Sequence, residues 1–244
     1  RFNIDHKATK WLDLGLKATV GYSKTNFADP EAGAGRQNWG NPWFTTLLAY
    51  PYESPDDWYN VDNPTLITKY YDRETGRLKT VASVYAKASI TDWLSVKTNF
   101  GLDFMYNRNV STLHRDHPNA QQNHGYYGQT SSELFRYTWT NTINVNKDFA
   151  NGHSLNAVAG MEMFQGKWYT SNFTGYDLNS DMMQSPAGIG DKSGSSLFPP
   201  SIGGGRTMSN LMSFFAQASY SIANKYNFSA SLRHDTSSKF YEDN

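Results

Sequence analysis

Residues 11–23 alternate between apolar and polar or small side chains without a break. The even positions are Leu12, Leu14, Leu16, Ala18, Val20 and Tyr22, and the odd positions between them hold Asp, Gly, Lys and Thr. Successive side chains of a β-strand point to opposite faces of its sheet, so this period of two places every apolar side chain on one face. An amphipathic helix would need a period of about 3.6 residues. The segment therefore predicts a strand with one apolar and one polar face.

The same period recurs along the chain and predicts eight strands. In the run that follows Trp93, only Thr98 interrupts the apolar side. The predicted strands cover residues 2–7, 11–23, 81–90, 93–107, 135–149, 155–163, 212–222 and 226–233. Several of them exceed the usual strand length of about 5 to 6 residues and the roughly 9 to 11 residues that a strand needs to cross a bilayer.

The predicted connections alternate between short and long. Residues 8–10, 91–92, 150–152 and 223–225 form short turns, and residues 24–79, 108–130 and 170–207 form long connections. Bacterial outer-membrane barrels have short periplasmic turns at one end and longer extracellular loops at the other. The order of the connections therefore favours a transmembrane barrel, with the long connections on the extracellular side.

Aromatic side chains stand beside the short turns. Trp11, Trp93 and Tyr226 follow a turn directly, and Phe149 precedes one. Tyr and Trp gather where the apolar and polar layers of a membrane meet, and such rings form the girdles of outer-membrane barrels. We therefore expect an all-β fold, an antiparallel up-and-down transmembrane β-barrel segment of about eight strands from a larger barrel.

Two other readings remain open at this stage. An antiparallel sheet with one buried face also alternates, so the chain could be a secreted soluble β-sandwich that acts as a binding module. Eight strands can also close on themselves, so it could be a complete small outer-membrane barrel with a structural or adhesive role. A soluble module should stay in solution without detergent, and a complete barrel should not continue far beyond either end.

Composition narrows the possible partners. The chain has 22 basic and 22 acidic residues, no Cys and a mean hydropathy of -0.66. A balanced charge does not favour a nucleic-acid partner, and the absence of Cys excludes disulfides and thiolate metal sites. The sequence has no apolar run of the roughly 18 residues that a membrane helix needs. It begins at Arg1, already in an alternating register, so we expect a piece of a longer protein.

No group of residues predicts catalysis. The glycine-rich stretch 201–206 lacks the Gly-Lys-Ser/Thr of a phosphate-binding loop. Glu162 falls on the polar side of its strand, where a solvated or Arg-paired carboxylate is ordinary, and no acid or base partner is identifiable. We therefore expect neither an enzyme nor a cofactor. One cluster could form a surface metal site or simply a polar loop: His114, Asp116, His117 and His124.

The first long connection is unusually aromatic. Exposed rings are costly unless they pack or bind, so this loop is expected to fold on itself, cover the barrel mouth or meet a partner. The residues predicted to contact a solute or a partner protein are Trp39, Trp43, Trp58 and Tyr59.

Two stretches of the sequence resemble a known family. Residues 1–12 read RFNIDHKATKWL, and residues 226–240 read YNFSASLRHDTSSKF. Both are similar to the barrel region of SusC/RagA-type TonB-dependent outer-membrane transporters, in which an Arg-Arg-Asp-Gly-Ser-Ser-Arg/Lys-Phe phrase ends a strand. His234 and Thr236 replace the Arg and the Gly of that phrase here.

The resemblance implies a barrel of about 22 strands filled by a plug domain. Residues 1–244 would be part of that single barrel domain, and the plug and the TonB-contacting segment would lie outside this chain. Family members lie in the bacterial outer membrane, in contact with its lipid. They import an oligosaccharide or a peptide together with a SusD-like surface lipoprotein, using energy passed on by TonB.

Overall fold

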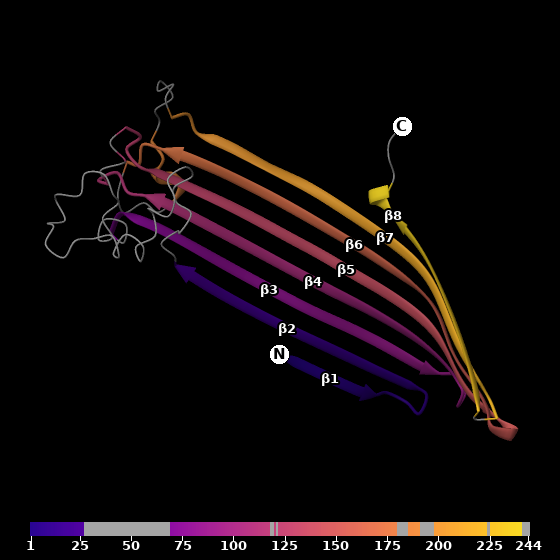
Figure 1. Cartoon of the computed structure of the whole chain (residues 1–244). Helices are drawn as coiled ribbons and strands as arrows, with labels where there is room; N and C mark the ends of the chain where they lie inside the picture. Colours follow the sequence, from indigo (N-terminus) through magenta and orange to yellow (C-terminus); the bar gives the residue numbers. More distant parts are fainter. Residues whose placement is uncertain are drawn as a thin grey trace, which may run out of the picture.

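A computed structural model describes residues 1–26, 69–117, 120, 122–179, 185–190, 198–223 and 225–240. They form one antiparallel sheet whose eight strands lie side by side in sequence order (Figure 1). The strands are β1 (Phe2–Lys7), β2 (Leu12–Asn26), β3 (Tyr71–Ser89), β4 (Leu94–Leu113), β5 (Tyr126–Phe149), β6 (His153–Tyr176), β7 (Ser201–Ile222) and β8 (Tyr226–Ser237). Short 3-10 turns are η3 (Ala150–Gly152), η4 (Pro186–Gly188) and η5 (Ser238–Phe240).

All eight predicted strands are present, but the prediction of their length was wrong for the middle of the sheet. β5 begins at Tyr126 instead of the predicted residue 135, and β6 continues to Tyr176 instead of ending at residue 163. The predicted long connections 24–79, 108–130 and 170–207 therefore include parts of β2 through β7. Alternation ends where both faces of a strand become polar, so a rule based on apolar side chains finds only the part with an apolar face.

The hairpins β1–β2 and β3–β4 share one turn geometry. Ala8 and Thr9 both donate backbone N–H groups to the Leu12 carbonyl, at 2.9 and 3.2 Å. Ile90 and Thr91 donate to the Leu94 carbonyl at the same two distances. In each turn the threonine hydroxyl also accepts a backbone N–H from the tryptophan two residues later. The Thr-x-Trp sequence immediately before β2 and β4 thus forms the same turn structure twice.

The apolar side chains line one face, as the alternation predicts. Directly paired residues follow one another across six strands, as in the row Leu16, Val84, Phe100, Trp139, Met163 and Met212. Thr98 lies on the same face, and its hydroxyl accepts a hydrogen bond of 2.9 Å from the indole N–H of Trp139. The Thr98 hydroxyl and the Trp139 indole N–H, two polar groups on the apolar face, therefore satisfy each other's hydrogen bonding.

The described residues contain almost no apolar core. The buried apolar side chains among them are only Ala120, Tyr127, Leu134 and Leu178. Large apolar side chains on β2, β7 and β8 are instead exposed, including Val20 at 64% and Leu232 at 77%. No second layer of described residues covers this face, so it needs an apolar environment from outside the sheet.

Among the described residues, no helix is long and apolar enough to cross a membrane.

The exposed apolar band runs obliquely across the strands. On β2 the lower edge of the band lies at Leu12. The row of directly paired residues that starts at Leu12 reaches Leu232 on β8, but the lower edge of the band on β8 is Tyr226, six residues before Leu232. On β2 the upper edge of the band lies at Lys24. The row that starts at Lys24 reaches Ser171 on β6, but the first charged residue above the band on β6 is Lys167, four residues before Ser171.

Both edges are therefore displaced by one residue per strand. A strand spacing of about 4.8 Å and a rise of about 3.3 Å per residue convert this displacement into a strand tilt of about 35°. Strands of transmembrane barrels tilt by about 35 to 45°. The band thus has the slope that a flat membrane would impose on a barrel wall.

Candidate functional site: the polar face and its rim

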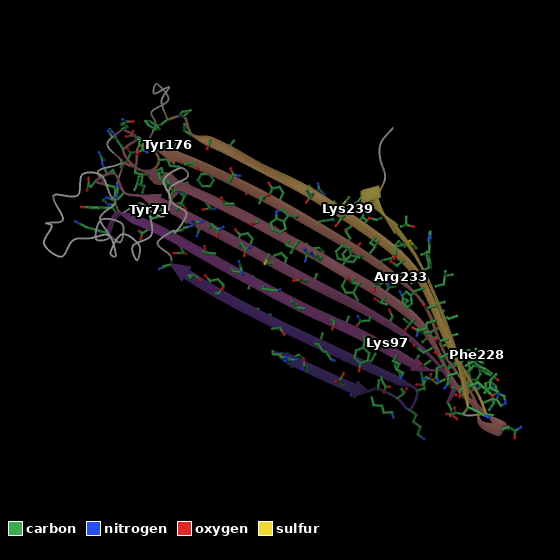
Figure 2. The ribbon with its side chains drawn as sticks, viewed as in Figure 1. Tyr71, Lys97, Tyr176, Phe228, Arg233 and Lys239 are labelled. Carbon is green, nitrogen blue, oxygen red and sulfur yellow. The ribbon has the colours of Figure 1, made fainter. Side chains whose placement is uncertain are left out.

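A hydrogen-bonded charge network lies on the polar face of β5 to β8. The guanidinium of Arg233, labelled in Figure 2, donates from Nε to Asp235 at 2.9 Å and from Nη2 to the buried Ser213 hydroxyl at 3.0 Å. The same Nη2 lies 3.5 Å from Glu162, whose other carboxylate oxygen accepts the Thr140 hydroxyl at 3.2 Å. Glu162 is therefore Arg-paired on the polar face. One cation between two carboxylates leaves the network with a net negative charge.

A second carboxylate on this face is incompletely satisfied. Asp103 on β4 is paired in register with Val81 on β3 and Arg136 on β5. Its Oδ1 atom is buried and has no hydrogen-bond partner within the described part of the chain. A buried carboxylate oxygen without a hydrogen-bond donor is energetically costly, so Asp103 is an unsatisfied position of the polar face.

Tyrosine hydroxyls form a small network at the end of the sheet that holds the long connections. The hydroxyls of Tyr71, Ser111 and Tyr126 lie 3.0 to 3.3 Å apart, and each contacts the other two. The Tyr126 ring meets the Tyr176 ring edge-on at 6.4 Å between centroids. Tyr71 and Tyr176 are labelled at this end of the sheet in Figure 2. The rim thus offers apolar ring surfaces whose polar tips are already hydrogen-bonded to one another.

Backbone contacts join the connections on either side of β5 and β6. Asp177 and Leu178 donate backbone N–H groups to the carbonyls of Asn123 and His124, at 3.0 and 3.1 Å. The carboxylate of Asp177 lies 3.0 Å from Nδ1 of His124, and Arg115 donates to the Leu178 carbonyl at 3.2 Å. These contacts join the β4–β5 connection to the β6–β7 connection at the end of the sheet that holds the long connections.

The histidine cluster is divided among separate contacts. His114 lies 3.7 Å from Asp116 and 5.2 Å from the Tyr70 ring, whereas His124 contacts Asp177. In the described ranges, no three His, Asp or Glu side chains come together as a possible metal site. The alternative of a polar loop accounts for these residues as described.

The four predicted contact residues Trp39, Trp43, Trp58 and Tyr59 lie outside the described residues. Tyr71 belongs to the aromatic first long connection of the sequence analysis but was not among the predicted contact residues. Tyr126 and Tyr176 were missed, because they lie in the parts of β5 and β6 beyond the alternation. The sequence signals for the rim were the tyrosine pairs Tyr70-Tyr71 and Tyr126-Tyr127, each between two predicted strands.

Comparison with known proteins finds similarity only at the level of structure. No family model matches the sequence, and no curated protein matches it. Among solved structures, the RagAB peptide transporter covers 98% of this chain with a TM-score of 0.77 and 18% identity. The RagAB peptide importer in its open-open state covers 99% with a TM-score of 0.78 and 17% identity.

The ferric preacinetobactin receptor BauA from Acinetobacter baumannii covers 97% of this chain at a TM-score of 0.50 and 12% identity. The chain spans 27% of the length of the RagAB chains and 33% of the BauA chain. The predicted resemblance to a RagA-type barrel is confirmed for the fold: this chain has the architecture of a barrel-wall segment like that of the RagAB peptide transporter.

Proposed function

We propose that this chain is part of the wall of a bacterial outer-membrane transporter that imports a solute. The observation that carries the proposal is a single two-faced sheet, apolar and uncovered on one side and polar on the other, with the fold of the RagAB chain along nearly its whole length. The apolar face would contact lipid, and the polar face would line the transport path. The short-turn end would be periplasmic.

The two alternative functions fit the sheet less well. A soluble β-sandwich packs its apolar faces between two sheets, whereas the apolar face here is uncovered by the described residues. A complete eight-stranded barrel requires its first and last strands to pair. Within the described residues β1 and β8 lie at opposite edges of an open sheet (Figure 1).

The finer functional proposals rest on the sequence resemblance. The complete transporter would also contain a plug domain in the lumen and a SusD-like lipoprotein lid, and TonB would supply its energy. The solute would be a peptide or an oligosaccharide, and RagAB is a peptide transporter. The rim tyrosines suit either class, because an aromatic ring packs against a sugar face or against an apolar side chain of a peptide. Transport requires no nucleophile or base, so we propose no enzymatic activity.

Uptake by cells that produce the intact protein tests the proposal. We expect a labelled peptide or oligosaccharide to accumulate, and we expect an uncoupler of the inner-membrane potential to abolish accumulation. Uptake that is unaffected by the uncoupler would contradict an energised transporter and would favour a passive pore. An intact protein that remains soluble without detergent would contradict the membrane location itself.

A deletion tests the first long connection separately. Replacing residues 28–69 by a short Gly-Ser linker should leave the barrel assembled, because every strand pair of the sheet lies outside that segment. Uptake and lid binding should be lost, since a connection this much longer than about 15 residues rarely persists without folding or binding. Substituting Trp39, Trp43, Trp58 and Tyr59 by Ala within the intact loop provides the finer test. Undiminished uptake and lid binding in both variants would remove the role assigned to this loop.

A further inference from the structure

Four side chains form a square on the outward face of β6 and β7, at the upper edge of the apolar band. Lys167 pairs in register with Met208, and Tyr169 pairs with Arg206. All four have the same strand parity as the apolar side chains below them, so none of them points toward the polar face. Tyr169 and Met208 are 55% and 52% exposed, and Arg206 is exposed as well. The square is therefore an open, outward-facing surface.

Its two cations lie on one diagonal of the square. Diagonal neighbours of an antiparallel pair stand about 7 to 8 Å apart, so one phosphate between Lys167 and Arg206 can accept hydrogen bonds from both. The Tyr169 hydroxyl, at a third corner, supplies another donor. Met208 at the fourth corner adds an apolar side chain, separated from Met212 of the band by Asn210.

Two other basic residues on the outward face at this height already have partners. Lys24 on β2 forms an ion pair of 2.8 Å with Glu74, and Arg108 on β4 donates to Gln129 at 3.1 Å. Lys167 and Arg206 form no ion pair or side-chain hydrogen bond with any described residue.

One acid stands near the square. Glu133 on β5 pairs in register with Tyr169, on the side away from Arg206, and lies diagonal to Lys167. It makes no ion pair within 4.0 Å with either cation among the described residues. The two cations outnumber this single carboxylate, so the surface keeps a net positive charge.

We propose that Lys167 and Arg206, with Tyr169, bind a phosphate of an anionic lipid headgroup in the outer leaflet. Position distinguishes lipid from free phosphate as the source. The square lies just above the apolar band: the highest apolar pair is Met163 and Met212, and the row between that pair and the square holds Gln165 and Asn210, whose side chains hydrogen-bond to each other at 2.8 Å. The acyl chain of a lipid whose headgroup sits at the square can lie along Met208 and the apolar side chains of the band below. A lipid gains from both the charge and the apolar surface, whereas a free phosphate gains from the charge alone. The inference rests on the proposed membrane position of the sheet and is independent of solute transport.

Binding of a defined lipid to the intact, detergent-purified transporter tests the site. The probes are bisphosphorylated lipid A, the same lipid without its phosphates, and inorganic phosphate. We expect the phosphorylated lipid to bind and the double variant Lys167→Gln/Arg206→Gln to bind it about 30-fold more weakly, as the loss of two headgroup contacts implies. Removing the lipid phosphates should weaken binding to the unsubstituted protein by a similar factor.

A charge-matched control separates the site from overall charge. Arg77 and Lys79 lie at a similar height on β3 but have the opposite strand parity, so they point to the polar face. The variant Arg77→Gln/Lys79→Gln removes the same charge and should retain lipid affinity within about twofold, because its cations lie away from the lipid.

Three results would overturn the proposal. They are equal weakening in the two double variants, equal affinity for the dephosphorylated lipid, and inorganic phosphate that competes fully at the concentration at which the lipid binds. Solute uptake, measured on the Lys167→Gln/Arg206→Gln variant, should be unchanged by loss of the lipid site. A failure of the lipid proposal is thus distinguishable from a failure of the transport proposal.

Discussion

Placing an arginine at Ala216 tests which face of the sheet contacts lipid. The outward-facing apolar run of β7 extends from Met212 to Ile222. With a rise of about 3.3 Å per residue and a tilt of about 35°, this run spans about 27 Å along the membrane normal, close to the apolar height of outer-membrane barrels. Ala216 then lies about 11 Å below the upper end, within about 3 Å of the midplane.

The expected cost follows from this depth. An arginine on the lipid face near the midplane destabilises a transmembrane barrel by about 2 to 4 kcal/mol, and the cost falls toward the interfaces. The residues paired with Ala216 are Ala159 and Leu232, so no carboxylate is adjacent to neutralise the new charge. We expect Ala216→Arg to lower the free energy of unfolding by an amount in the upper part of this range, measured by urea unfolding of the intact protein in lipid vesicles.

The neighbouring residue supplies a control at nearly the same depth. Gln217 points to the polar face and is exposed there, opposite Val158 and Ser231. Gln217→Arg should change the free energy of unfolding by less than about 0.5 kcal/mol. Equal destabilisation by the two substitutions, or a larger loss from Gln217→Arg, would refute the assignment of the faces and with it the lipid-facing band.

Two further substitutions test local contacts by the same urea unfolding assay. Thr98→Val should cost about 1 kcal/mol, because the Trp139 indole N–H loses its acceptor, and adding Trp139→Phe should recover part of that loss; additive effects would contradict the coupling. Gly160→Ala should cost about 1 to 3 kcal/mol, since a Cβ there would lie 2.6 Å from the Asn141 carbonyl oxygen, whereas Gly21→Ala, with nothing within 4 Å, should be neutral. Equal costs at both glycines would show that close packing at Gly160 is not the cause.

The sequence predicted the strands wherever one face is apolar and the other polar. The run from Leu12 to Tyr22 was sufficient, because a period of two has only one structural solution there. The same rule could not find the upper half of β6, where Tyr169, Ser171 and Phe173 alternate with Thr170, Asn172 and Thr174. These residues form a strand because they pair with the neighbouring strands, and the alternation of apolar and polar residues within one segment carries no information about that pairing.

The polar network was only half predictable. The side of Glu162 followed from its neighbours Met161 and Met163, which occupy the apolar parity. Its partner Arg233 is 71 positions away in the chain, and the two meet because β6, β7 and β8 pair in a particular register. A register is set by turns and packing along the whole sheet, so the spacing of residues in one strand cannot specify it.

The slope of the apolar band also sets the width of the space behind the wall. A strand tilted by about 35° occupies about 6 Å of circumference, so eight strands make an arc of about 48 Å. Closed on itself, that arc would be about 15 Å across, which inward side chains alone can fill. A ring of about 22 strands, as the sequence resemblance implies, would be about 42 Å across. Side chains such as Asp103 and Arg136 cannot reach the far wall of such a ring, so their inward partners would be water or another folded domain.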